Sequence, residues 1–260
     1  MDPRCAPFLT VITPCVIPVP VAGRLVPSYE ESLLVGRRVG SALGVGFVLA
    51  AQAYAPRLGG DLGAAGSAAT QAVRHFEGLG DKLGRAQALN LLGCIARDDR
   101  RFDDAASHLR EAQALRHEVG DRRGEWMTRA NAALSLSLQG DAVGGRDEAH
   151  ACLAAFEAVE DQPSVANTLG LLGALALASG DVSLAREWYS RAVTGLVRQS
   201  WPRIEAWYRI LLAELSMEAG DPRAARPEVD VAAKLLRLQR SQIAQARLAA
   251  LQRRLDLPAG

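Results

Sequence analysis

A Gly-Asp pair recurs at a fixed interval along this chain, and this spacing constrains the fold more than any single residue does. The pair and its half-period copies occur at Gly60-Asp61, Gly80-Asp81, Gly120-Asp121, Gly140-Asp141, Gly180-Asp181 and Gly220-Asp221, with Glu160-Asp161 in one further slot. A fixed period of this size is typical of a solenoid, whose units bury their apolar faces against their neighbours. We therefore expect a stacked array rather than one compact core.

Each 40-residue block contains two amphipathic helical patterns. The five blocks are residues 41–80, 81–120, 121–160, 161–200 and 201–240. In the second block Phe102, Ala105, Leu109, Ala112 and Leu115 recur at spacings of three and four, which is the helical period. Gly can end the first helix of a block, and Asp can cap the second. No window alternates with a period of two, so the predicted fold class is all-α.

Small residues occupy equivalent positions in successive blocks. Gly93 and Gly173 share one position of the first helix, and Ala105 and Ala185 share one position of the second. Small side chains at these positions allow two antiparallel helices to approach closely. The first block fits the pattern least well, because three residues weaken its first helix: Gly44, Gly46 and Pro56.

These positions resemble the pattern of the tetratricopeptide repeat (TPR). The matching residues are Leu92-Gly93, Ala105, Leu109 and Ala112, repeated as Leu172-Gly173, Ala185, Tyr189 and Ala192. The usual TPR unit has about 34 residues. The chain therefore resembles the longer variety found in Leu-Gly-Asn-rich scaffold proteins and in the C-terminal arrays of actinobacterial ATPase transcription regulators, the latter especially at residues 81–86 and 117–124. The resemblance implies a right-handed α-solenoid of stacked antiparallel helix pairs, the TPR superhelix.

The resemblance also implies binding rather than catalysis. It favours a non-catalytic protein–protein or peptide interaction scaffold, as the TPR sensory array of a bacterial regulatory protein. Two alternatives stay open: a stand-alone intracellular peptide receptor of the quorum type that acts on a transcription regulator, and a fragment of a multidomain ATPase. The sequence has no G-x-x-x-x-G-K-[ST] phosphate loop, no G-x-S-x-G nucleophile elbow and no H-E-x-x-H zinc helix. We therefore expect no enzyme activity, no cofactor and no metal.

Cysteine usage favours the cytoplasm, and the charge argues against a nucleic-acid surface over the whole protein. The four cysteines lack C-x-x-C spacing, so neither a disulfide framework nor a zinc site is indicated. The net charge is only +1. Six basic residues gather near the C-terminus: Lys234, Arg237, Arg240, Arg247, Arg253 and Arg254. Two interpretations stay open. These residues form a weak binding site for nucleic acid or for an acidic partner, or they are the solvated surface of a capping helix.

The ends of the chain depart from the repeat. We expect an irregular Pro-rich apolar segment at 1–26, a half-repeat helix at 27–40, five TPR-like helix pairs at 41–240, and a capping helix and tail at 241–260. Prolines between residues 6 and 22 break a helix, and the run is short for a membrane span. It lacks the basic start of a signal peptide, so we interpret it as a linker or a remnant of an upstream domain. Ser28 and Glu31 form a capping box for the half-repeat helix.

The inner face of the first helices is the predicted binding surface. By the TPR register, the residues of this concave face are Phe47, Tyr54, Arg57, Gln87, Asn90, Cys94, Arg97, Met127, Asn167, Trp207, Ile210, Glu214 and Met217. Asn90 and Asn167 can bind a peptide backbone, and arginines can bind a carboxylate through two N–H groups. Trp207 and Met217 can anchor apolar side chains. The alternative is that some of these residues are solvated or packed on the next repeat. The expected partner is a protein or peptide, without a membrane, and homo-oligomer formation stays open.

Overall fold

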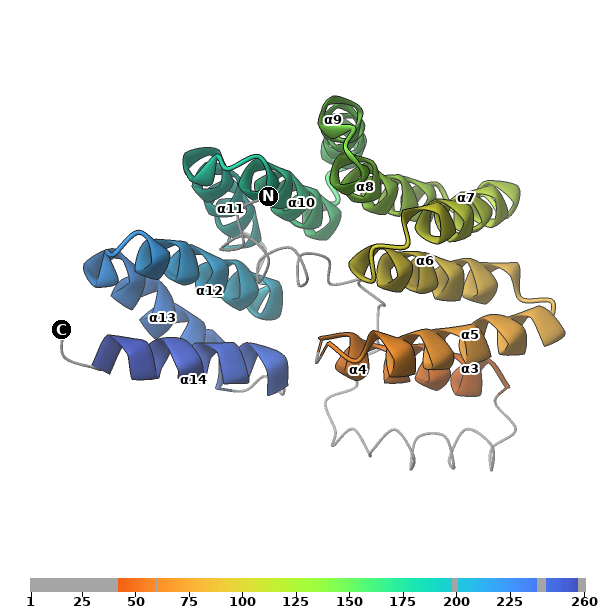
Figure 1. Cartoon of the computed structure of the whole chain (residues 1–260), viewed down its shortest axis with the longest axis horizontal. Coiled ribbons are helices and arrows are strands. Elements are labelled where there is room, and N and C mark those ends of the chain that lie inside the picture. Colours follow the sequence, from red (N-terminus) through yellow and green to blue (C-terminus); the bar gives the residue numbers. More distant parts are fainter. Residues whose placement is uncertain (1–41, 59, 198–200, 238–241, 257–260) are drawn as a thin grey trace. The chain divides into compact units, whose positions relative to one another are not determined.

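The computed structural model describes residues 42–58, 60–197, 201–237 and 242–256, and every regular element in these ranges is a helix. The helices are α3 (Ala42–Gln52), α4 (Tyr54–Leu58), α5 (Leu62–Gly78), α6 (Lys82–Asp98), α7 (Phe102–Glu118), α8 (Arg122–Gln139), α9 (Ala142–Ala158), α10 (Gln162–Ala178), α11 (Val182–Val197), α12 (Pro202–Glu218), α13 (Pro222–Leu236) and α14 (Gln242–Asp256) (Figure 1). The predicted all-α solenoid fold class is confirmed.

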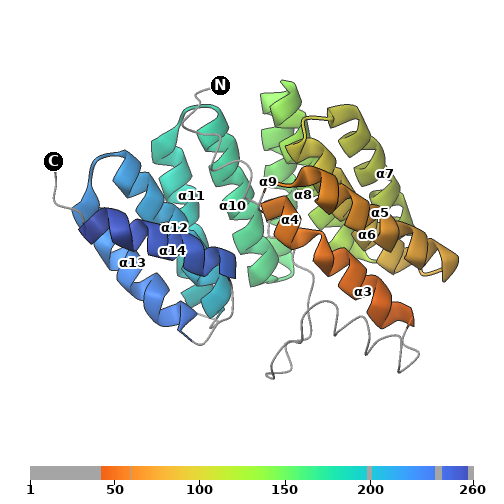
Figure 2. The same ribbon diagram turned by 60° about the horizontal axis from the view of Figure 1, so that its bottom comes forward.

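The described helices form two compact units, residues 42–148 and residues 149–256, which we name the N-terminal unit and the C-terminal unit. Within the N-terminal unit α5 packs on α6, α6 on α7 and α7 on α8. Within the C-terminal unit the order continues from α10 to α13, and α14 packs on both α12 and α13 (Figures 1 and 2). Helices that are neighbours in sequence are therefore neighbours in space, as the repeat period predicts.

The turn between consecutive helices follows one pattern of hydrogen bonds. At the end of α5, Gly80 has a φ of 67° and the Asp81 N–H donates to the Phe76 carbonyl at 3.0 Å. The Asp81 carboxylate then accepts from the Gly84 N–H at 3.0 Å, which caps α6. The same carboxylate cap occurs at Asp61, Asp121, Asp141, Asp161, Asp181 and Asp221. Each recurring Gly-Asp pair therefore ends one helix and starts the next.

Two turns keep this geometry without glycine. Arg100 has a φ of 61° and Glu160 a φ of 54°, close to the value at Gly80. Both residues occupy the slot that glycine fills in the other turns of the series. A residue with a Cβ costs roughly 1–2 kcal/mol in this left-handed conformation. Packing of the flanking helices therefore imposes the turn even where the sequence opposes it.

The small residues of the repeat lie where two helices meet. A Cβ built on Gly93 of α6 would be 2.7 Å from Leu109 Cγ and 3.3 Å from the Ala105 carbonyl oxygen of α7. A Cβ on Gly173 would meet Tyr189 of α11 even more closely. Leu109 and Tyr189 are buried and therefore fill the space that the two glycines leave.

The first block has an interrupted helix, as its sequence suggested. The helix stops at Gln52 and resumes at Tyr54 as the short α4. Pro56 explains the break, because it has no N–H for the Gln52 carbonyl and its ring crowds that carbonyl. The predicted segments at 1–26 and 27–40, with Ser28 and Glu31, lie outside the described residues. Within the described ranges, no helix combines the length and the apolar character required to cross a bilayer.

Candidate functional site

By the TPR register, the inner positions of the C-terminal unit include a row of residues that follows the repeat period. Asn167 of α10, Trp207 of α12 and Arg247 of α14 occupy equivalent positions, because α14 begins where a sixth block would begin. The Arg247 guanidinium carbon lies 5.0 Å from the centre of the Trp207 ring. Arg247 also donates from Nε to Glu214 Oε1 at 2.7 Å and from Nη2 to Glu214 Oε2. The closing helix is therefore attached to α12 through Trp207 and Glu214.

Each residue of this row carries a buried polar atom without a hydrogen-bond partner. These atoms are Asn167 Oδ1, Trp207 Nε1 and Arg247 Nη1. The three side chains are nevertheless only partly buried as a whole. One acceptor and two donors, on side chains that keep some exposed surface, are groups of the kind that bind the N–H and C=O of a polypeptide backbone. Buried polar atoms in folded proteins nearly always have a partner, and here three of them lie at equivalent positions of the repeat, which makes this row a candidate binding site.

Two buried tyrosines lie beside the row. The Tyr189 and Tyr208 rings are 6.0 Å apart between centroids, and both hydroxyls are buried without a partner. The Tyr208 hydroxyl lies against Gly170 of α10, where any Cβ would overlap with it. Burial raises the pKa of both phenols, so each stays a neutral O–H donor. Burial also raises the pKa of Glu214, and Arg247 opposes that shift.

The structure places the predicted residues of the N-terminal unit differently. Asn90 is buried, and its Oδ1 accepts from Asn131 Nδ2 of α8 at 3.0 Å. Arg57 and Arg97 are brought together, because both pair with Asp98. These side chains hold neighbouring helices to one another. Four predicted residues keep part of their surface: Phe47, Tyr54, Gln87 and Met127; Cys94 is buried.

The remaining predicted residues of the C-terminal unit divide between core and surface. Ile210 is fully buried and belongs to a cluster with Ala213, Val229 and Leu248. Met217 is partly buried against this cluster. A binding role for the thirteen predicted residues stays a prediction. The register alone would have added Arg247 to them, because it follows Trp207 by one full repeat.

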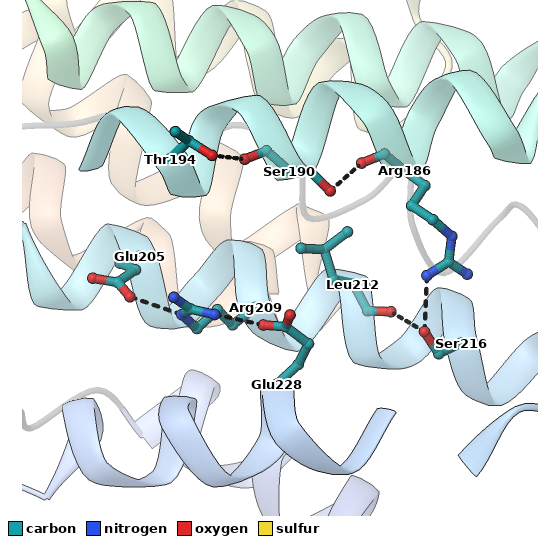
Figure 3. A network of polar contacts seen from close by, with 8 residues as sticks. All are labelled: Arg186, Ser190, Thr194, Glu205, Arg209, Leu212, Ser216 and Glu228. Atoms are coloured by element: carbon teal, nitrogen blue, oxygen red, sulfur yellow. Dashed lines mark hydrogen bonds and ion pairs between the residues drawn. The ribbon is translucent and has the colours of Figure 1, made fainter. Parts of the chain in front are cut away.

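A second polar network in the same unit connects α11, α12 and α13 (Figure 3). Arg209 donates to Glu205 and to Glu228, each at 2.7 Å, and Arg186 Nη1 donates to Ser216 Oγ at 2.9 Å. The Arg209–Glu228 pair has a counterpart two blocks earlier, Arg129–Glu148. A pair that recurs between the two helices of a block joins those helices, so we assign this network to the structure of the repeat.

A cleft of about 400 Å³ lies between α9, α10 and α11 of the C-terminal unit. Val165, Ala166 and Leu169 line it, together with Glu157 and Arg191, which form an ion pair 3.7 Å long. None of the residues that line it has a buried polar atom without a partner. In the described part of the chain, no three His, Cys, Asp or Glu side chains are grouped so that they could hold a metal ion. The inner row is therefore the stronger candidate site.

Comparisons with known proteins identify the fold. No protein-family model matches the chain, and no curated protein matches it. Among similar solved structures is the crystal structure of BtubC (BKLC) from P. vanneervenii, which is 22% identical with a TM-score of 0.53, over 80% of this chain and 88% of that chain. Another is the apo form of the quorum sensor NprR from B. thuringiensis, 14% identical with a TM-score of 0.48, over 88% of this chain and 65% of that chain. The likeness to BtubC shows a shared fold, and this fold is an all-helical repeat.

Proposed function

We propose that this chain is a non-catalytic scaffold that binds a polypeptide along the inner face of its C-terminal unit. The observation that carries the proposal is the row of Asn167, Trp207 and Arg247, each with a buried polar atom that lacks a partner. A partner's backbone in an extended conformation offers donors and acceptors repeatedly along one edge. The partner's backbone can therefore supply a hydrogen-bond partner for each of the three side chains, whatever the amino-acid sequence of the partner.

Arg247 is positioned for this role before any partner binds. Two hydrogen bonds to Glu214 and the face of Trp207 fix its guanidinium, which leaves Nη1 as the donor for a partner carbonyl. A side chain held in its binding conformation loses less entropy on association than a mobile one. Met217, partly buried one turn beyond Glu214, offers an adaptable apolar contact for a partner side chain.

We further propose that the scaffold is the interaction array of a bacterial regulatory protein and that it acts in the cytoplasm. The support is the resemblance of its repeats to TPR arrays of regulators, together with the scattered cysteines. A stand-alone peptide receptor would use the same inner face. An upstream reading frame with a nucleotide-binding loop would favour the regulator, whereas a neighbouring gene for a small peptide precursor would favour the receptor.

Photo-crosslinking tests which face binds. A benzoylphenylalanine replaces Met217 on the inner face in one variant and exposed Val182 on α11 in the control. After irradiation in lysate, mass spectrometry identifies what is attached. We expect a polypeptide attached at position 217 and none at position 182. Attachment at 182 alone would move the binding surface to the outer helices.

A further inference from the structure

In the N-terminal unit an arginine side chain bridges the two helices that flank its own helix. Arg85 of α6 donates from Nη2 to Glu111 Oε1 of α7. The same Nη2 lies 3.5 Å from Glu77 Oε1 of α5. The exposed fraction of the Arg85 side chain is 28%, so most of its stem is covered. One guanidinium therefore joins two carboxylates across the groove between α5 and α7.

The C-terminal unit has no such arginine at the equivalent position. Two full repeats after Arg85 the residue is Val165 of α10, whose short side chain cannot bridge two helices. On α9, Glu157 keeps the carboxylate at the equivalent position, whereas α11 has Arg191 in place of a glutamate. Val165, Glu157 and Arg191 all line the cleft of about 400 Å³. By the repeat register, this cleft lies where the N-terminal unit places an arginine side chain.

The cleft combines an apolar lining with an excess of negative charge. Its apolar part comes from three buried residues of α10, Val165, Ala166 and Leu169. Two carboxylates, Glu157 and Glu187, line it together with the one guanidinium of Arg191. That guanidinium is already engaged, because it lies 4.8 Å from the centre of the Trp188 ring and 3.7 Å from Glu157. The lining therefore matches a ligand with an aliphatic stem and a cationic head.

We propose that this cleft binds a small organic cation, an alkylguanidinium, in the way that the N-terminal unit holds the side chain of Arg85. The alkyl stem contacts the apolar residues of α10, and the planar guanidinium donates to Glu157 and Glu187. The volume of about 400 Å³ is within the range of small-molecule sites. The cleft shares no residue with the row of Asn167, Trp207 and Arg247, so this site does not rest on the function proposed for that row.

Titration of the full chain with n-butylguanidinium, followed by saturation-transfer difference NMR, tests the ligand class. The control ligand is n-butylurea, which has nearly the same shape but no charge. We expect n-butylguanidinium to bind and n-butylurea to bind several-fold more weakly, because only the cation forms ion pairs with the two carboxylates. Equal affinities for the two compounds would overturn the proposal, and so would the absence of n-butylguanidinium binding.

Two variants test whether the ligand occupies the cleft. Val165→Arg gives α10 the residue that α6 has at position 85, so its side chain should fill the cleft and abolish binding. Glu187→Gln removes one carboxylate and should raise Kd by roughly 2–5-fold, the effect of an exposed ion pair. The control is Asp230→Asn on α13, which is exposed, lies outside the cleft and should leave Kd unchanged.

Undiminished binding by a folded Val165→Arg variant would overturn the proposal. If circular dichroism shows that this variant does not fold, Glu187→Gln decides, because an exposed carboxylate can be replaced at little cost to the fold. Equal Kd values for Glu187→Gln and Asp230→Asn would then exclude the cleft as the site.

Discussion

Arg247 of α14 lies over the ring of Trp207 of α12, with 5.0 Å between the guanidinium carbon and the ring centre. The same arginine binds Glu214, two helical turns further along α12. α14 takes the place that the first helix of a further block would have, so Arg247 has the same position in the repeat register as Trp207. The closing helix therefore has two roles, since it covers the apolar end of the stack and supplies one residue of the candidate site.

Replacement of a small residue between paired helices should destabilise the fold. Ala185 is fully buried in α11, opposite the first helix of its block. Ala185→Leu should lower the free energy of unfolding by about 1–3 kcal/mol, because the larger side chain forces the helices apart. Ala154→Leu on an exposed face of α9 is the control and should change it by less than about 0.5 kcal/mol. Similar urea midpoints for the two variants would refute this assignment of the helix contact.

Glycine should stabilise the protein at Arg100 and Glu160, the two left-handed turn positions described above that are occupied by another residue. Glu160 holds a φ of 54°, a conformation that favours glycine. We expect Glu160→Gly to raise the free energy of unfolding by about 1 kcal/mol, through relief of the strain at Cβ. Glu187→Gly inside α11 should have the opposite sign and a similar size, because glycine is unfavourable in a helix. Thermal unfolding of both variants checks the signs, and a lower midpoint for Glu160→Gly would contradict the prediction.

The recurring aspartates should each contribute as helix caps. The Asp221 carboxylate accepts from the Ala224 N–H at 3.0 Å at the start of α13. Asp221→Ala should therefore lower the free energy of unfolding by about 0.5–2 kcal/mol. Asp230 lies exposed inside the same helix, and Asp230→Ala should have little effect. Urea titration of the two variants distinguishes a cap from a general charge effect, which would shift both alike.

The fold could be predicted from the sequence because the same local signals recur in every block. Gly80 and Asp81 define one turn, and their repetition defines the whole series. The left-handed backbone conformation of Arg100 could not be predicted from the sequence in this way, because arginine does not favour it and the packing of the flanking helices imposes it.

The site was only partly predictable, for a different reason. The register assigned Asn90 and Arg97 to the inner face, but it could not show that Asn131 and Asp98 would bind them. Such contacts depend on which side chain of a neighbouring helix happens to be opposite. Trp207, in contrast, is partly exposed, and the inner position that its register implies stays a prediction.

The affinity of the captured polypeptide for two tryptophan variants tests the central claim most directly. Trp207→Phe keeps an aromatic face for Arg247 and removes only the Nε1 donor, whereas Trp188→Phe makes the same change beneath Arg191 on outer helix α11. A neutral hydrogen bond contributes about 0.5–1.5 kcal/mol, so Trp207→Phe should raise Kd by roughly 2–10-fold by titration calorimetry. Trp188→Phe should leave Kd unchanged. An unchanged Kd for Trp207→Phe together with a raised Kd for Trp188→Phe would contradict binding on the inner face.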